Sequence, residues 1–181
     1  MRIISGKFGG RRISPPVKMP YTRPTTDIAK EGLFNILQTR IDFEGCKTLD
    51  LFGGTGCISY ELASRGAADL TIIEKDTQMQ AFIKKNIEML GVENCKILKM
   101  DVFSFLSTCS EQYDFIFAGP PYALNTIDEL PKIIVSKQLI AADGFFVLEH
   151  TPRNNYEKYD GFSFQRNYGT TVFSFFAPVN K

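Results

Sequence analysis

A glycine-rich segment between Thr48 and Ile58 has the residue types of a ligand-binding turn. Its apolar first half is typical of a buried strand, and Gly53, Gly54 and Gly56 follow where that strand should end. Glycine adopts positive φ angles easily and lets the backbone approach a ligand closely. The helix predicted next begins with N–H groups that have no partner within the helix. The pattern fits either a tight strand-to-helix turn or a loop that holds a cofactor.

Two carboxylates favour the cofactor interpretation and indicate the kind of cofactor. Glu74 ends the next strand-like run, 18 residues after Gly56, where an acidic side chain can accept hydrogen bonds from both ribose hydroxyls. Asp50 lies just before the glycines, where its charge would repel the pyrophosphate of a dinucleotide. A cofactor with a cationic amino-acid end would instead be attracted. We therefore expect S-adenosylmethionine rather than a nicotinamide dinucleotide.

A further acidic position, Asp101, follows another predicted strand. Its carboxylate could accept a hydrogen bond from an adenine amino group while Val102 packs on the ring. It could equally be the N-cap of the helix predicted to begin at Val102, and the sequence favours neither interpretation. Lys75, directly after Glu74, belongs to the same group of candidate cofactor contacts.

The segment Gly119-Pro120-Pro121-Tyr122 is typical of a rigid loop suited to base chemistry. Paired prolines fix the backbone so that carbonyl groups can converge on one point, and a tyrosine ring offers a face on which a base can stack. An exocyclic amine is a poor nucleophile because its lone pair is delocalised into the ring. Acceptors on its two N–H groups would free that lone pair for a methyl group, by positioning and without a metal ion. A proline turn with a core tyrosine is the alternative interpretation.

Strand and helix signals alternate from Cys46 onward, and this alternation predicts how the loops are positioned. It is typical of an α/β fold with a parallel sheet and helices on both faces, whose ligands bind at the carboxyl edge of the strands. After the last parallel strand, two further strands form a closing hairpin around Tyr168-Gly169 that adds an antiparallel edge. Strands are predicted at 69–73, 96–100, 113–118, 144–149, 161–167 and 170–177, and helices at 28–38, 57–64, 77–90, 102–107 and 126–137.

The first 20 residues form a distinct basic segment. Strand-like residues 2–5 and 11–14 flank glycines, which predicts a small β-hairpin with Lys7 at a flexible tip. Such an arm is too small to have a core of its own, so we expect it to lean on the main domain and present its cations. Residues 1–40 contain eight Lys or Arg against two Asp or Glu, although the whole chain has a net charge of +1. A basic end on a slightly acidic body indicates a polyanionic partner. A solvated surface without a partner is the alternative.

The composition narrows the classes of protein to which the chain can belong. A chain of 181 residues with 44% hydrophobic and 23% charged residues is expected to form one domain, residues 1–181. The four cysteines are not closely paired and there is one histidine, so neither a disulfide framework nor a metal site is expected. The sequence shows no leader-like segment and no run that could span a bilayer. We expect a cytoplasmic monomer without membrane contact.

These motifs together resemble a known family. Residues 50–56, Glu74 and Pro120-Pro121-Tyr122 resemble the seven-stranded, Rossmann-like S-adenosylmethionine-dependent methyltransferases that modify exocyclic amines. Residues 2–12, 23–27 and 31–35 are similar to the bacterial 16S ribosomal RNA guanine-N2 methyltransferases, and the resemblance covers nearly the whole chain. It implies a mostly parallel seven-stranded sheet and methylation of one guanine in the small-subunit RNA, on an assembled or assembling particle. S-adenosylhomocysteine would be the product.

The predicted site residues fall into three groups. The candidate cofactor-binding residues are Thr25, Asp50, Phe52, Gly53, Gly54, Thr55, Gly56, Glu74, Lys75, Asp101 and Val102. The candidate catalytic residues are Gly119, Pro120, Pro121 and Tyr122. The candidate RNA-binding residues are Arg2, Lys7, Arg11, Arg12 and Arg23.

One position departs from the family pattern. The family's loop begins with Asp or Asn, whose side chain accepts from the target amine, whereas this chain has Gly119. The carbonyl groups of Gly119 and Pro120 remain, and loss of one positioned acceptor is expected to cost on the order of 10²–10³ in rate. Gly119 therefore indicates a slow or inactive enzyme, a variant residue, or a substitute carboxylate such as Asp114. Asp114 lies five residues earlier in a strand, which should put it out of reach.

Two other functions fit parts of the sequence. A catalytically impaired RNA-binding or assembly factor would keep the fold and bind the cofactor without transferring a methyl group. An adenine-N6 DNA methyltransferase would share the Pro-Pro-Tyr loop, but nothing in the chain resembles a target-reading domain. A hairpin arm also suits an irregular RNA surface better than a regular groove.

Overall fold

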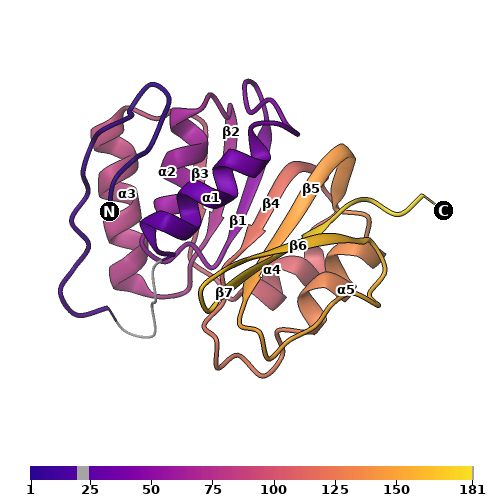
Figure 1. Ribbon diagram of the computed structural model, residues 1–181. Helices are drawn as coiled ribbons and strands as arrows, with labels where there is room; N and C mark the ends of the chain where they lie inside the picture. The colour runs from indigo at the N-terminus through magenta and orange to yellow at the C-terminus, as the bar shows by residue number, and fades with distance from the viewer. Residues whose placement is uncertain (20–24, 181) are drawn as a thin grey trace.

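A seven-stranded sheet forms the centre of the molecule in the computed structural model, which describes residues 1–19 and 25–180 (Figure 1). The strand order is β3-β2-β1-β4-β5-β7-β6. β7 alone runs in the direction opposite to the other strands of the sheet. This arrangement confirms the predicted α/β fold. The strands are β1 (Lys47–Leu51), β2 (Asp69–Ile73), β3 (Cys95–Leu98), β4 (Tyr113–Ala118), β5 (Ile140–His150), β6 (Phe162–Tyr168) and β7 (Thr171–Phe176).

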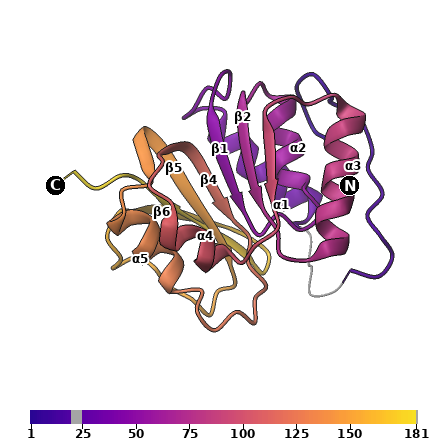
Figure 2. The same cartoon turned by 180° about the vertical axis from the view of Figure 1, so that it is seen from behind.

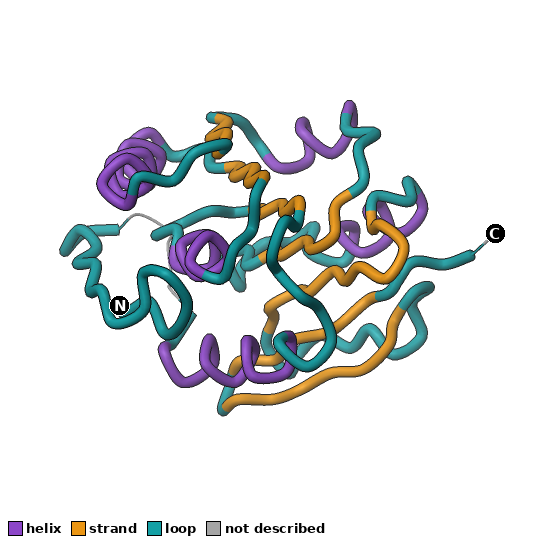
Figure 3. The backbone as a smooth tube through the Cα atoms, turned by 90° about the horizontal axis from the view of Figure 1, so that it is seen from above, coloured by secondary structure: helices purple, strands orange, loops and turns teal. Residues whose placement is uncertain are grey.

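Helices cover both faces of the sheet, as Figure 3 shows from above. α1, α2 and α3 pack on one face, and α4 and α5 pack on the other. Each face buries its own apolar cluster, because alternate residues of the central strands point to opposite sides. The helices are α1 (Asp27–Leu37), α2 (Cys57–Ser64), α3 (Thr77–Leu90), α4 (Val102–Thr108) and α5 (Glu129–Ser136).

Local capping residues fix where the helices begin. The side chain of Thr26 accepts from the Ala29 N–H and caps α1, which leaves the neighbouring Thr25 for another contact. Gly91 ends α3 with a φ of 69°, as expected of a C-terminal glycine. Two predicted boundaries differ from the structure by three residues or more. α5 begins at Glu129 rather than residue 126, and β5 extends back to Ile140 rather than starting at residue 144.

The closing hairpin has the predicted place but not the predicted turn. Tyr168 pairs with Thr171, so the turn residues are Gly169 and Thr170 rather than Tyr168-Gly169. Gly169 takes a φ of 64°, which glycine adopts without strain. The register of this hairpin places β7 directly beside β5, with Phe173 opposite Glu149.

The amino-terminal arm forms the predicted small hairpin and leans on the main body of the domain, as expected. Its two sides pair through an isolated bridge between Arg2 and Arg12 and through backbone hydrogen bonds such as that from the Ile3 N–H to the Arg11 carbonyl oxygen, at 2.9 Å. A short two-stranded hairpin is marginal by itself, and here the apolar side chains of Ile3, Phe8 and Ile13 are buried against α2 and α3 instead. Figure 2 shows the arm running along this side of the molecule. The arm is therefore part of the packed body.

Buried polar groups attach the arm to α1 and α2. The Glu61 carboxylate accepts from the backbone N–H groups of Ile4 (2.8 Å) and Ser5 (3.1 Å). The ammonium group of Lys30 lies 3.6 Å from Glu61 Oε1 and donates to the Arg2 carbonyl oxygen at 2.6 Å. Both side chains are almost fully buried. The sequence gives no hint of this network, because its members are far apart in the chain.

Candidate functional site

The loops at the carboxyl edge of the sheet enclose a cavity of about 410 Å³. The loops after β1, β2, β3 and β4 and the carboxyl end of β5 all contribute to its lining, as the edge rule for open α/β sheets predicts. Every predicted catalytic residue lines this cavity, and so does every predicted cofactor-binding residue except Gly56. Cys57, Ile58, Met100 and Phe117 add apolar lining that the sequence alone did not identify.

The glycine turn has an unexpected distribution of strained positions. Gly54 and Gly56 take positive φ angles of 56° and 82°, as predicted, but Gly53 does not. Gly53 is required by close packing, since a Cβ there would lie 2.5 Å from a methyl carbon of Ile72. The remaining positive φ, 63°, belongs to Phe52, a residue type that rarely adopts it. Strain of this kind persists at functional sites where the surroundings enforce it.

Asp50 lies beneath this turn as a buried carboxylate. It is 2% exposed, and its Oδ2 accepts from the Ser59 hydroxyl at 2.7 Å. Burial raises the pKa of Asp50 to about 8, the charge of Glu74 adds to that rise, and the Ser59 hydrogen bond opposes it. Asp50 therefore holds a proton at neutral pH until a positive charge enters the cavity.

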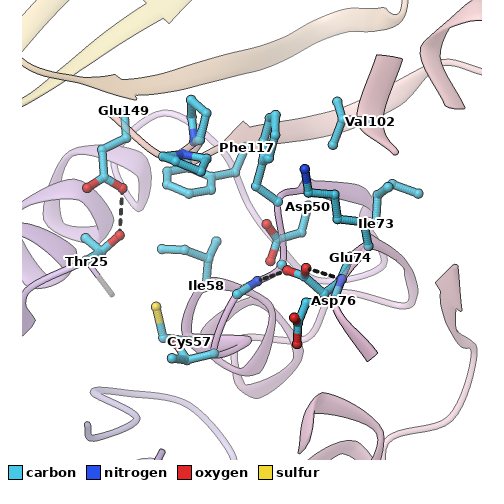
Figure 4. A pocket seen from close by; sticks show the side chains of 18 of the residues that line it. Thr25, Asp50, Cys57, Ile58, Ile73, Glu74, Asp76, Val102, Phe117 and Glu149 are labelled. Atoms are coloured by element: carbon cyan, nitrogen blue, oxygen red, sulfur yellow. Dashed lines mark hydrogen bonds between the residues drawn. The ribbon is translucent and has the colours of Figure 1, made fainter. Parts of the chain in front are cut away.

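Glu74 joins the glycine turn to the start of α3. Its Oε2 accepts from the Gly54 N–H at 2.7 Å, and its Oε1 accepts from the Asp76 N–H at 2.9 Å. These two backbone bonds, drawn in Figure 4, hold the carboxylate at one end of the cavity. A ribose could be bound there by the same carboxylate that positions the turn.

Asp101 and Val102 border the same cavity. The Asp101 side chain accepts from the Ser104 N–H at 3.0 Å, so the N-cap interpretation is confirmed. Val102 is 4% exposed and packs into the core. Contact of either residue with an adenine stays a prediction.

The diproline loop closes the cavity over β4. Gly119 donates its N–H to the Leu51 carbonyl oxygen at 3.4 Å, which ties the start of the loop to β1. Tyr122 is half-buried at the cavity wall rather than a core residue. Its hydroxyl donates to Glu149 Oε1 at 3.2 Å and lies 3.4 Å from the Thr171 hydroxyl. The loop is thus held by both of its neighbouring strands.

Glu149 is a cavity residue that the sequence predictions missed. It is 6% exposed and is the last residue but one of β5, and its Oε2 accepts from the Thr25 hydroxyl at 2.7 Å. In Figure 4, Glu149 and Thr25 face each other at the opposite end of the cavity from Glu74 and Asp76. The edge rule could have found Glu149, because it ends a predicted strand.

The predicted RNA-binding residues lie on the arm and are exposed where the structure describes them. Arg23 is outside the described residues. The Lys7 N–H donates to the carbonyl oxygen of Ser64, the last residue of α2, at 2.7 Å. The glycine turn lies at the other end of α2, which is roughly 12 Å long at 1.5 Å per residue. The arm tip is therefore separated from the cavity by the length of that helix.

Metal-ligating clusters and membrane-spanning helices are both missing from the part of the chain that the structure describes. Within residues 1–19 and 25–180, no three His, Cys, Asp or Glu side chains are grouped so that they could hold a metal ion. Over the same residues, no helix combines the length and the apolar character needed to cross a membrane.

Comparison with known proteins gives a consistent family. Residues 1–177 match the model of a family described as Conserved hypothetical protein 95. Ribosomal RNA small subunit methyltransferase D of Escherichia coli strain K12 is 31% identical over 154 residues, covering 85% of this chain and 76% of that protein. The protein of the same name from Buchnera aphidicola (Acyrthosiphon pisum) is 33% identical over 154 residues, with coverages of 84% and 79%.

Comparison with solved structures agrees with the comparison of sequences. A solved Escherichia coli structure, yhhF, described as a candidate methyltransferase, superposes with a TM-score of 0.83 and 26% identity, covering 97% of this chain and 96% of that one. The chain therefore belongs to the Conserved hypothetical protein 95 family, the family of ribosomal RNA small subunit methyltransferase D.

Proposed function

We propose that this protein transfers a methyl group from S-adenosylmethionine to the exocyclic N2 amine of a guanine in 16S ribosomal RNA. One observation carries the proposal: the acidic glycine turn and the diproline loop line the same cavity. Its volume, about 410 Å³, lies within the usual range for small-molecule sites. Family membership supports ribosomal RNA of the small subunit as the substrate.

The side chains of the cavity fit the proposed cofactor. Asp50 offers a carboxylate near the glycine turn, where a cationic amino-acid end would favour loss of its proton. Glu74 offers carboxylate oxygens for ribose hydroxyls at the end of β2. Val102 and Phe117 give apolar surface for a flat ring. When bound, S-adenosylmethionine supplies an electrophilic methyl group, and no redox step or metal ion is required.

The diproline loop and its neighbours are proposed to hold the base. The Tyr122 ring stacks against the guanine, and the carbonyl groups of Gly119 and Pro120 accept from the N2 amine. These contacts orient the nitrogen lone pair towards the methyl group, so positioning supplies most of the acceleration. The loop suits this role because the prolines restrict its backbone.

The exposed cations of the arm are proposed to bind phosphates of the RNA. Arg11 and Arg12 are exposed on a segment whose apolar side chains are packed, so their guanidinium groups are presented from a fixed support. Such contacts position the RNA without reading its sequence. On this proposal the protein acts as a monomer in the cytoplasm, where small subunits or their assembly intermediates are found.

Labelled methyl transfer to 30S particles that lack the modification tests this function. The RNA is digested after reaction, and the labelled nucleoside is identified. We expect label in N2-methylguanosine. Label in N6-methyladenosine would favour the adenine alternative, and cofactor binding without transfer would favour an RNA-binding factor. Absence of any affinity for S-adenosylmethionine or S-adenosylhomocysteine in calorimetry would contradict the proposal.

A further inference from the structure

Gly119 leaves the diproline loop without the side-chain acceptor that the family pattern places there. Its φ is not positive, so its backbone would accept a side chain. A Cβ at this position would lie 3.0 Å from the Phe117 ring and 3.2 Å from Glu149 Oε2. A carboxylate of another residue therefore already lies beside the place where the missing side chain would begin.

The sheet register explains this proximity. β4 and β5 are parallel neighbours, with Ala118 opposite Leu148, so the next residues along each strand, Gly119 and Glu149, lie side by side at the cavity. Asp114 cannot serve instead. Its Oδ2 accepts from the Lys47 N–H at the start of β1, at the other end of the sheet.

Other cavity carboxylates have different positions. Asp50 is bound to Ser59 beneath the glycine turn, and Glu74 is bound to backbone groups of that turn. Asp76 caps α3, and Asp101 caps α4. Glu149 lies instead at the end of the cavity opposite Glu74 (Figure 4). There its Oε1 accepts from the Tyr122 hydroxyl. Among the acidic residues that line the cavity, it is the one in contact with the diproline loop.

Two hydroxyl groups hold the Glu149 carboxylate in place. Thr25 donates to Oε2 at 2.7 Å, and Tyr122 donates to Oε1 at 3.2 Å. These two bonds, one to each carboxylate oxygen, fix the orientation of the carboxylate at the cavity. A pre-oriented acceptor is what an amine held by the diproline loop requires.

We infer that Glu149 supplies the side-chain acceptor for the target amine, in place of the residue missing at Gly119. This inference rests on the proposed function. The N2 nitrogen forms a C–N bond to the methyl carbon as the C–S bond of the donor breaks, and the sulfur keeps the electron pair. The positive charge passes to the amine, whose released proton is accepted by Glu149 and then by water. The site is therefore complete without Asp or Asn in the loop.

The decisive test asks whether Gly119→Asp restores the methyl-transfer activity that Glu149→Ala removes. Wild type, Glu149→Ala, Glu149→Gln, Gly119→Asp and the double variant Gly119→Asp/Glu149→Ala are compared in single-turnover methyl transfer to unmodified 30S particles. Glu149→Ala should lose on the order of 10²–10³ in rate, the effect of removing one positioned group. Glu149→Gln keeps a carbonyl acceptor and should lose less. The double variant should recover activity, because Asp at 119 restores an acceptor at the same place.

Calorimetry with S-adenosylhomocysteine and thermal melting of each variant separate chemistry from folding. A purely structural role for Glu149 would give a loss that Gly119→Asp does not rescue, and that result would overturn the inference. Equal rates for wild type and Glu149→Ala would overturn it while leaving the proposed function intact. An inactive wild type with an active Gly119→Asp variant would overturn both, since it would show an impaired site.

Discussion

Asp50 illustrates how one residue can combine binding with a cost in stability. The folded protein holds a proton on this carboxyl up to a pKa of about 8, whereas the ordinary value is 3.8. Between these values the folded state binds one more proton than the unfolded chain. Stability from this group is therefore fully present below about pH 4 and is lost as pH rises towards 8, by on the order of 1 kcal/mol per pH unit.

Replacing Asp50 tests the sign of this pH dependence of stability. Asp50→Asn keeps an acceptor for the Ser59 hydroxyl but cannot ionise. We expect the variant to be more stable than wild type, with a difference that grows between about pH 5 and pH 8 in urea unfolding. S-adenosylmethionine should bind the variant more weakly, because its cationic end would meet no carboxylate. A stability difference that stays constant with pH would contradict the raised pKa.

Tyr122 is expected to contribute through its ring more than through its hydroxyl. Tyr122→Ala should lower methyl transfer by roughly 10- to 100-fold, the effect of removing one stacking interaction of about 1–3 kcal/mol. Tyr122→Phe is the matched control because it keeps the ring and removes the hydroxyl, which contacts Glu149 and Thr171. Affinity for S-adenosylhomocysteine should not change in either variant. Equal losses in both would show that the hydroxyl, not stacking, matters.

At the scale of elements, a buried charged network attaches the arm to α1 and α2, in addition to the packing of its apolar side chains. Glu61→Ala would leave Lys30 buried without its carboxylate partner and remove the acceptor for two arm N–H groups. We expect a loss of about 3–5 kcal/mol in unfolding free energy. Glu129→Ala, which removes an exposed ion pair with Lys132, is the control and should change stability little.

Amide hydrogen exchange of the same Glu61→Ala variant tests how the arm is attached to the rest of the domain. Amide hydrogen exchange of Glu61→Ala should show faster exchange at Ile4 and Ser5 than in wild type, since both N–H groups donate to that carboxylate. Unchanged protection at these two amides would mean that packing of the apolar side chains alone holds the arm.

The sequence predicted the elements better than it predicted their charged contacts. Alternation of strands and helices is a local signal, and it located the sheet, the glycine turn and Glu74 at its edge. The burial of Glu61 depends on partners 56 and 57 positions away, and that of Glu149 on Thr25, 124 positions away. The positive φ of Phe52 is imposed by the turn and has no signature in its residue type.

At the scale of the whole molecule, the arm tip and the cavity lie at opposite ends of α2. Bound RNA that reaches both would have to cross the length of that helix. Replacing Arg11 and Arg12 with Ala should weaken RNA binding. The slope of its salt dependence should fall by roughly one unit for each phosphate that the variant no longer neutralises. Filter binding at several salt concentrations measures this slope.

A charge-matched control separates this interaction from a general effect of net charge. Lys132→Ala/Lys158→Ala removes two positive charges near α5, on the other face of the sheet. That variant should keep the wild-type salt slope. Equal slopes for the arm variant and wild type would remove the arm from the RNA interface.

The antiparallel position of β7 has a consequence for protein synthesis. Glu149 leaves the ribosome well before the strand that flanks it, because its neighbour Phe173 lies near the carboxyl end of the chain. A nascent chain that stops after β6 has the complete glycine turn and the diproline loop, but the outer side of β5 is bare. On the proposed function, such a chain would hold the methyl donor before it is able to use it, so chemical competence would arrive only with β7.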